Sequence, residues 1–100
     1  MSYDPGALNA ALAAAVGEDF ALIADLRVAF MESAERQLDL LRNAQSDANW
    51  EVASWRLKGL AASFGLTHLM ALADEAADCA RGDPRILRQL RMAIDRLQQS

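Results

Sequence analysis

The chain has 100 residues, 53 % hydrophobic and 24 % charged, which is enough to bury one compact core and too little for two. Its formal net charge of -4 would repel a nucleic-acid backbone, and no basic run offsets that charge. We therefore expect a single domain over residues 1–100 that does not bind nucleic acid.

The lone cysteine and the short apolar runs limit the compartment and the chemistry. Because Cys79 is the single cysteine, the chain can form neither an internal disulfide nor a cysteine-rich zinc site. No apolar run approaches the roughly 18 residues of a membrane span, and the start lacks the basic and apolar segments of a signal peptide. These features predict a cytoplasmic protein with no membrane partner, no metal and no cofactor.

Helix-forming residues dominate the composition. The chain holds 21 Ala and 15 Leu against seven β-branched residues, which predicts an all-α fold. A short helix over residues 5–15 is expected first, because Asp4 can cap it, Pro5 suits its first position and Gly17 ends it.

A long amphipathic helix is expected over residues 18–44. Glu18 and Asp19 open it with charges that oppose the helix dipole. Apolar residues then recur with helical spacing. They are Phe20, Ile23, Leu26, Val28, Phe30, Met31, Ala34, Leu38 and Leu41.

Three more helices follow, over residues 48–64, 68–80 and 84–98. Ser46-Asp47, Thr67 and Gly82-Asp83-Pro84 supply the breaks and caps, and Gly65 can take the left-handed conformation that ends the first of the three. Short links make neighbouring helices antiparallel. We expect an up-down four-helix bundle with the first short helix across one end.

The helix over 48–64 carries large or small apolar residues on two opposite faces. Its core stripe, about 100° wide, contains Trp50, Ala53, Leu57, Leu60, Ala61 and Phe64. Trp55 lies about 170° from the centre of that stripe, at about 100° per residue. On the same outward side lie Glu51, Val52, Lys58, Gly59 and Ala62.

An outward tryptophan beside a glycine and an alanine is typical of a protein-binding surface. Glycine inside a helix costs about 1 kcal/mol relative to alanine, and tryptophan is enriched among interface hot spots. The alternative interpretation is an ordinary exposed aromatic, or one covered by the short first helix.

The segment 55–66, Trp-Arg-Leu-Lys-Gly-Leu-Ala-Ala-Ser-Phe-Gly-Leu, resembles the signature of histidine phosphotransfer (HPt) domains, His-x-Leu-Lys-Gly-Ser/Ala-x-x-x-x-Gly-Ala. The helix breaks along nearly the whole chain are similar to that family as well. The resemblance implies bacterial-type two-component signalling, in which the first motif position is the histidine that carries phosphate. Here that position is Trp55.

The substitution removes the family's chemistry at that position, because an indole nitrogen has no basic lone pair to accept a phosphoryl group. The resemblance then implies a non-enzymatic docking or regulatory domain, a pseudo-phosphotransferase, whose partner is a response-regulator receiver domain or a histidine kinase. Trp55 would anchor that partner, Lys58 and Arg56 would face its carboxylates, and Gly59 would give it access.

Two alternatives remain. His68, the single histidine, is the one substitute phospho-acceptor and would make the chain an active phosphocarrier. A purely structural bundle would instead oligomerise, for example as a homodimer through the Trp55 side. Asp74, Glu75 and Asp78 are interpreted as a solvated face, and Cys79 as a small core residue.

Overall fold

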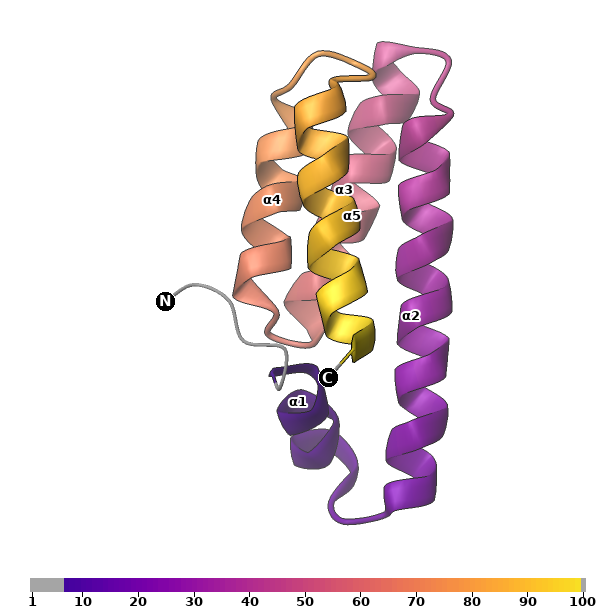
Figure 1. The fold of residues 1–100 in the computed structure, drawn as a ribbon, viewed down its shortest axis with the longest axis vertical. Helices are drawn as coiled ribbons and strands as arrows, with labels where there is room; N and C mark the ends of the chain where they lie inside the picture. Colours follow the sequence, from indigo (N-terminus) through magenta and orange to yellow (C-terminus); the bar gives the residue numbers. More distant parts are fainter. Residues whose placement is uncertain (1–6, 100) are drawn as a thin grey trace.

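The computed structural model describes residues 7–99, and these form five α-helices and no strand (Figure 1). They are α1 (Ala7–Val16), α2 (Phe20–Arg42), α3 (Asp47–Ser63), α4 (Thr67–Ala77) and α5 (Pro84–Gln99). The all-α prediction is confirmed for this part of the chain. The predicted start of the first helix at Asp4-Pro5 lies outside the described residues.

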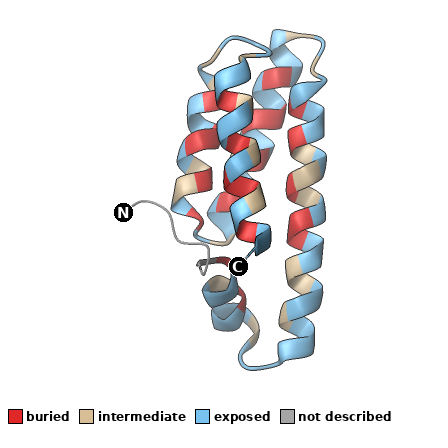
Figure 2. Ribbon diagram, in the orientation of Figure 1, coloured by how far each residue is buried: buried red, intermediate tan, exposed pale blue. Residues whose placement is uncertain are grey.

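The four longer helices lie side by side, and α1 packs at one end of them (Figure 1). Helix α3 packs on α2 and α4, and α5 packs on the same two helices, so α3 and α5 lie on opposite sides of the molecule. Buried residues face inward from every helix (Figure 2). None of the helices within residues 7–99 is both long enough and apolar enough to cross a membrane.

Side chains cap the starts of α2 and α3; the Ser46-Asp47 cap was predicted, whereas Asp19 was expected inside the first turn and is the N-cap instead. The Asp19 carboxylate accepts a hydrogen bond from the Leu22 amide at 3.0 Å, and the Ser46 hydroxyl accepts one from the Asn49 amide at 3.1 Å. Each bond satisfies an amide that the first helical turn leaves without a partner. The helices therefore begin one or two residues away from the predicted positions.

The turn between α3 and α4 has the geometry of a Schellman motif. Gly65 has φ +64°, its amide donates to Ala62 O at 3.1 Å, and the Leu66 amide donates to Ala61 O at 3.0 Å. The predicted left-handed Gly65 is confirmed. The prediction of Thr67 as a cap is wrong. Thr67 is the first residue of α4, and the N-cap position before it is Leu66, whose side chain makes no capping hydrogen bond.

Helix α4 is shorter at its far end than the sequence predicted. It ends at Ala77, with Asp78 as its C-cap, rather than at residue 80. The next helix begins at Pro84 as predicted, and the Asp83 carboxylate accepts a hydrogen bond from the Arg85 amide at 2.9 Å.

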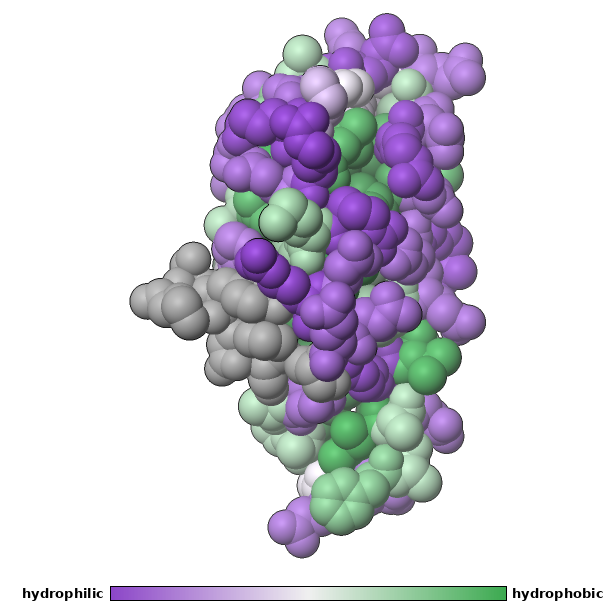
Figure 3. Space-filling view, in the orientation of Figure 1, coloured by the Kyte–Doolittle hydropathy of each residue, from purple (hydrophilic) through white to green (hydrophobic). Residues whose placement is uncertain are grey.

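The first turns of α2 correct the predicted core. Phe20 is 80 % exposed and Val28 is 58 % exposed, although the periodicity assigned both to the buried face. The first turns of α2 extend past the ends of α3, α4 and α5, with α1 beside them (Figure 1), which leaves Phe20 exposed. Val28 is exposed for another reason: its neighbour Arg27 still reaches the Leu97 carbonyl of α5, but Val28 lies about 120° around the helix from the buried Ala34. Hydrophobic side chains accordingly gather on the surface at this end (Figure 3).

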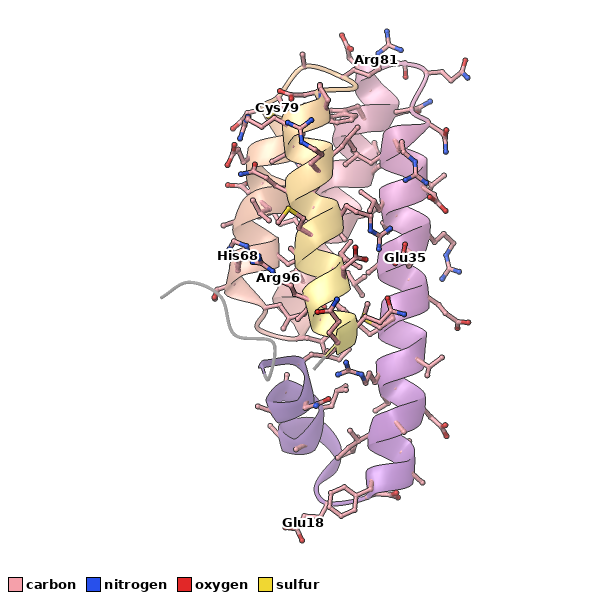
Figure 4. All side chains as sticks on the ribbon, in the orientation of Figure 1. Glu18, Glu35, His68, Cys79, Arg81 and Arg96 are labelled. Carbon is pink, nitrogen blue, oxygen red and sulfur yellow. The ribbon has the colours of Figure 1, made fainter. Side chains whose placement is uncertain are left out.

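Ion pairs join the helices where they run together. The Arg91 guanidinium on α5 donates to both carboxylate oxygens of Glu35 on α2, with Nη1 to Oε1 at 2.7 Å, and its Nε donates to Asp95 at 3.0 Å (Figure 4 labels Glu35). These bonds hold the pKa of the Glu35 carboxyl below its ordinary value and raise the pKa of Arg91. Arg27 on α2 donates to Asn9 of α1 and to the carbonyl of Leu97 on α5.

Candidate functional site

Helix α3 presents two tryptophans to two different environments. Trp50 is 2 % exposed, and its indole N–H donates to the carbonyl of Ala76 on α4 at 2.7 Å. Trp55 is 55 % exposed. Five residues separate the two, which is about 140° of helical rotation at 3.6 residues per turn. One tryptophan therefore belongs to the core and the other to the surface, as the sequence predicted.

The packing behind Trp55 fixes the orientation of α3. Leu57 and Ala61 are fully buried, Ala53 is nearly so, and the buried Ser54 hydroxyl donates to the Trp50 carbonyl at 2.9 Å. Leu60 and Phe64 were predicted in the core stripe and are half-buried at its edge. The Phe64 ring meets Phe30 of α2 edge to face, with centroids 5.0 Å apart. These contacts leave Trp55 on the outside.

The seven residues predicted as a binding surface lie on the outward side of α3, and we name them the Trp55 face. Six of them are exposed and Lys58 is half-buried. The members are Glu51, Val52, Trp55, Arg56, Lys58, Gly59 and Ala62. The neighbours of Trp55 one turn along this face are Val52 and Gly59 together with the charged Glu51 and Lys58, so the backbone beside the indole is bare only at Gly59.

Nothing in the described residues 7–99 requires a glycine at position 59. It lies inside α3 without a positive φ, and a Cβ built on it would meet nothing within 4 Å. Gly17, Gly65 and Gly82 differ, because each has a positive φ that favours glycine. The helix therefore gives up stability at Gly59 without a gain in packing or turn geometry inside the chain.

Lys58 is engaged by a neighbouring helix. Its ammonium lies 2.8 Å from a carboxylate oxygen of Asp74 on α4, and the two side chains are 43 % and 61 % exposed. The sequence did not predict this pair, which joins residues 16 positions apart. Asp74 thereby adds a carboxylate to the border of the Trp55 face.

A shallow groove of about 290 Å³ borders the other side of the face. Val52 and Arg56 line it together with Leu40 of α2. Leu40 is exposed, although it is a large apolar residue. Its place beside the Trp55 face could not be predicted from the sequence, because that place depends on how α2 and α3 pack.

His68 and Cys79 lie away from the Trp55 face, at opposite ends of α4 (Figure 4). His68 is half-buried in the first turn. Cys79 is half-buried just beyond the last turn, and its thiol pKa is raised by burial and by the nearby Asp83 carboxylate. A raised pKa leaves the thiol protonated at neutral pH and therefore a weak nucleophile.

The acidic side chains of α4 are exposed, as predicted, but two of them form ion pairs. Asp74 contacts Lys58, and Glu75 contacts Arg85 of α5 at 2.8 Å. Within residues 7–99, no three His, Cys, Asp or Glu side chains come close enough together to hold a metal ion.

Comparison of the chain with known protein families, with curated proteins and with solved structures found no match.

Proposed function

We propose that the chain is an HPt-like module, an antiparallel up-down four-helix bundle with an additional N-terminal helix, that binds a receiver domain without relaying phosphate. The proposal rests on the resemblance of residues 55–66 to the HPt signature. The phosphate transfer that this signature implies is lost here, because the Trp55 indole has no basic lone pair to accept phosphate.

One observation supports the proposal most strongly: Trp55 lies outward in mid-helix, one turn from a glycine that no contact within residues 7–99 requires. An aromatic anchor next to a bare stretch of backbone fits a partner that approaches α3 closely. The mixed charges of Arg56, Lys58 and Glu51 around the anchor favour orientation and association rate more than affinity.

A module of this kind regulates by occupancy. It would compete with an active phosphotransfer domain for the receiver, or hold the receiver in one state, to the extent that its affinity differs between the two receiver states. A histidine kinase is the second partner class that the resemblance implies, and it belongs in the same binding assay.

The test compares the affinity of the wild type and of Trp55→Ala for a panel of receiver domains from the same genome. We expect Trp55→Ala to lose about 2 kcal/mol, which is a dissociation constant about 30-fold weaker. Met92→Ala is the matched control, since Met92 is 52 % exposed on α5, on the other side of the molecule, and should leave binding unchanged.

Equal losses in both variants, or no receiver binding by the wild type, would contradict the proposal. Phosphate on His68 after incubation with a phosphorylated receiver would favour the active phosphocarrier. Self-association that Trp55→Ala abolishes would favour a homodimer through the Trp55 face.

A further inference from the structure

Asp74 on α4 forms an ion pair with Lys58, the lysine that the Trp55 face would offer to an acidic partner. The Lys58 ammonium is one helical turn from Trp55, and it points toward α4, where Asp74 holds it at 2.8 Å. In the proposed function this lysine meets carboxylates of the receiver domain. A carboxylate of a partner must therefore compete with Asp74 for that charge.

We infer that Asp74 is an internal competitor for Lys58 and so determines how strongly, and to which acidic partner, the Trp55 face binds. The inference rests on the proposed function and extends the interaction surface from α3 onto α4. The partner that it fits is a receiver domain whose carboxylates can replace that of Asp74.

The exposure of the pair makes the exchange feasible. Both side chains are more than a third exposed. An exposed pair is held weakly and water solvates the released carboxylate, whereas breaking a buried pair would leave an uncompensated charge. Asp74 can thus turn into solvent while Lys58 changes partner, with no rearrangement of the helices.

The release of Lys58 from Asp74 changes the net charge around Trp55. Glu51 and Asp74 contribute two negative charges, and Arg56 and Lys58 contribute two positive charges, so this set is neutral. Without Asp74 it is positive by one charge and complementary to an acidic partner. Complementary charge at an interface acts mainly on the association rate and on the choice between partners.

The test is a double-mutant cycle on receiver binding, with Asp74→Asn, Lys58→Gln and the double variant. Asp74→Asn should bind the receiver about two- to fivefold more tightly at low ionic strength, with the gain reduced at about 0.5 M salt. In the Lys58→Gln background the same change should have no effect, because there is no ammonium to release.

Glu75→Gln is the matched control, since it removes the same charge from the adjacent position of α4. Glu75 pairs with Arg85 rather than with Lys58. Its variant should bind as the wild type does. Equal gains from Asp74→Asn and Glu75→Gln, or a gain that persists without Lys58, would show a general charge effect and overturn the inference while the proposed function stands.

Absence of binding by the wild type and by Asp74→Asn alike would overturn both the proposed function and this inference. Binding by the wild type that Asp74→Asn leaves unchanged would overturn the inference alone. Asp74→Asn and Lys58→Gln should both fold, because removing one member of an exposed ion pair changes stability little. A thermal melt of each variant checks that point before the titrations.

Discussion

Replacing Gly59 with alanine should make the protein more stable and its binding weaker. The stability gain follows from helix propensity, because alanine is favoured over glycine inside a helix by about 1 kcal/mol. The new methyl group has room, since a Cβ at this position meets nothing within 4 Å. The Ser63 hydroxyl donates to the Gly59 carbonyl at 2.9 Å, and a change of side chain leaves that bond in place.

The expected gain is measurable by thermal or urea unfolding. About 1 kcal/mol corresponds to a rise in Tm of about 4–8 °C for a domain of this size. Gly65→Ala is the matched control with the opposite sign, because Gly65 has φ +64° and alanine is strained there. Receiver binding by Gly59→Ala should weaken about tenfold, since the methyl group occupies space that a close partner needs.

The stability of Gly59→Ala tests whether the glycine serves the fold, and its receiver binding tests whether a partner contacts α3 at this position. A Gly59→Ala protein that is no more stable than the wild type would show that the glycine serves the fold, which would remove the argument for an external partner. A stabilised variant that binds receivers as tightly as the wild type would show that no partner approaches α3 at this position.

Further predictions concern the core, the ion pairs and the lost chemistry. Trp50→Phe should cost about 1–3 kcal/mol in urea unfolding, because it removes the buried indole hydrogen bond to the Ala76 carbonyl, which still accepts from the Cys79 amide, and because the smaller ring leaves a cavity in the core. Glu35→Gln should cost about 0.5 kcal/mol at neutral pH, discounted because the pair with Arg91 is a third exposed. Since the folded pKa of Glu35 lies below its ordinary value of 4.5, this contribution is present above pH 4.5 and disappears as the pH falls through the folded pKa, so melts of the two proteins should converge in acid. Trp55→His should accept phosphate from a phosphorylated receiver, detected as an acid-labile label, and failure to do so would mean that the surrounding surface no longer supports the transfer.

Local features of the fold could be predicted from the sequence, because they depend on a few adjacent residues. Gly65 was expected to be left-handed, and the starts of α2 and α3 lie within two residues of the predicted positions. The outward position of Trp55 follows from helical periodicity once Trp50 and Leu57 are assigned to the core.

Features that depend on how far one helix extends past another could not be predicted. Periodicity assigned Phe20 to the core without any information on where α3 and α5 end beside α2. Met92 is a further large apolar residue that helix packing leaves exposed. It lines a groove between α2 and α5 and is half exposed, because the two helices do not close over it.

The contacts that shape the candidate site are long-range and depend on the register of neighbouring helices. Asp74 reaches Lys58 across 16 residues, and Leu40 comes beside Val52 only because α2 and α3 pack together. The sequence therefore located the Trp55 face on one helix, whereas the structure adds residues of α2 and α4 at its borders.

The most direct test of the central claim is an NMR titration of the labelled protein with receiver domains from the same genome, with and without a phosphoryl mimic. We expect the NMR signals of the Trp55 indole and of the Lys58 and Gly59 amides to shift, while the signal of the buried Trp50 indole, which donates to Ala76, stays in place. No shift with any receiver, or shifts centred away from these residues, would contradict the claim that the Trp55 face is a receiver-docking surface.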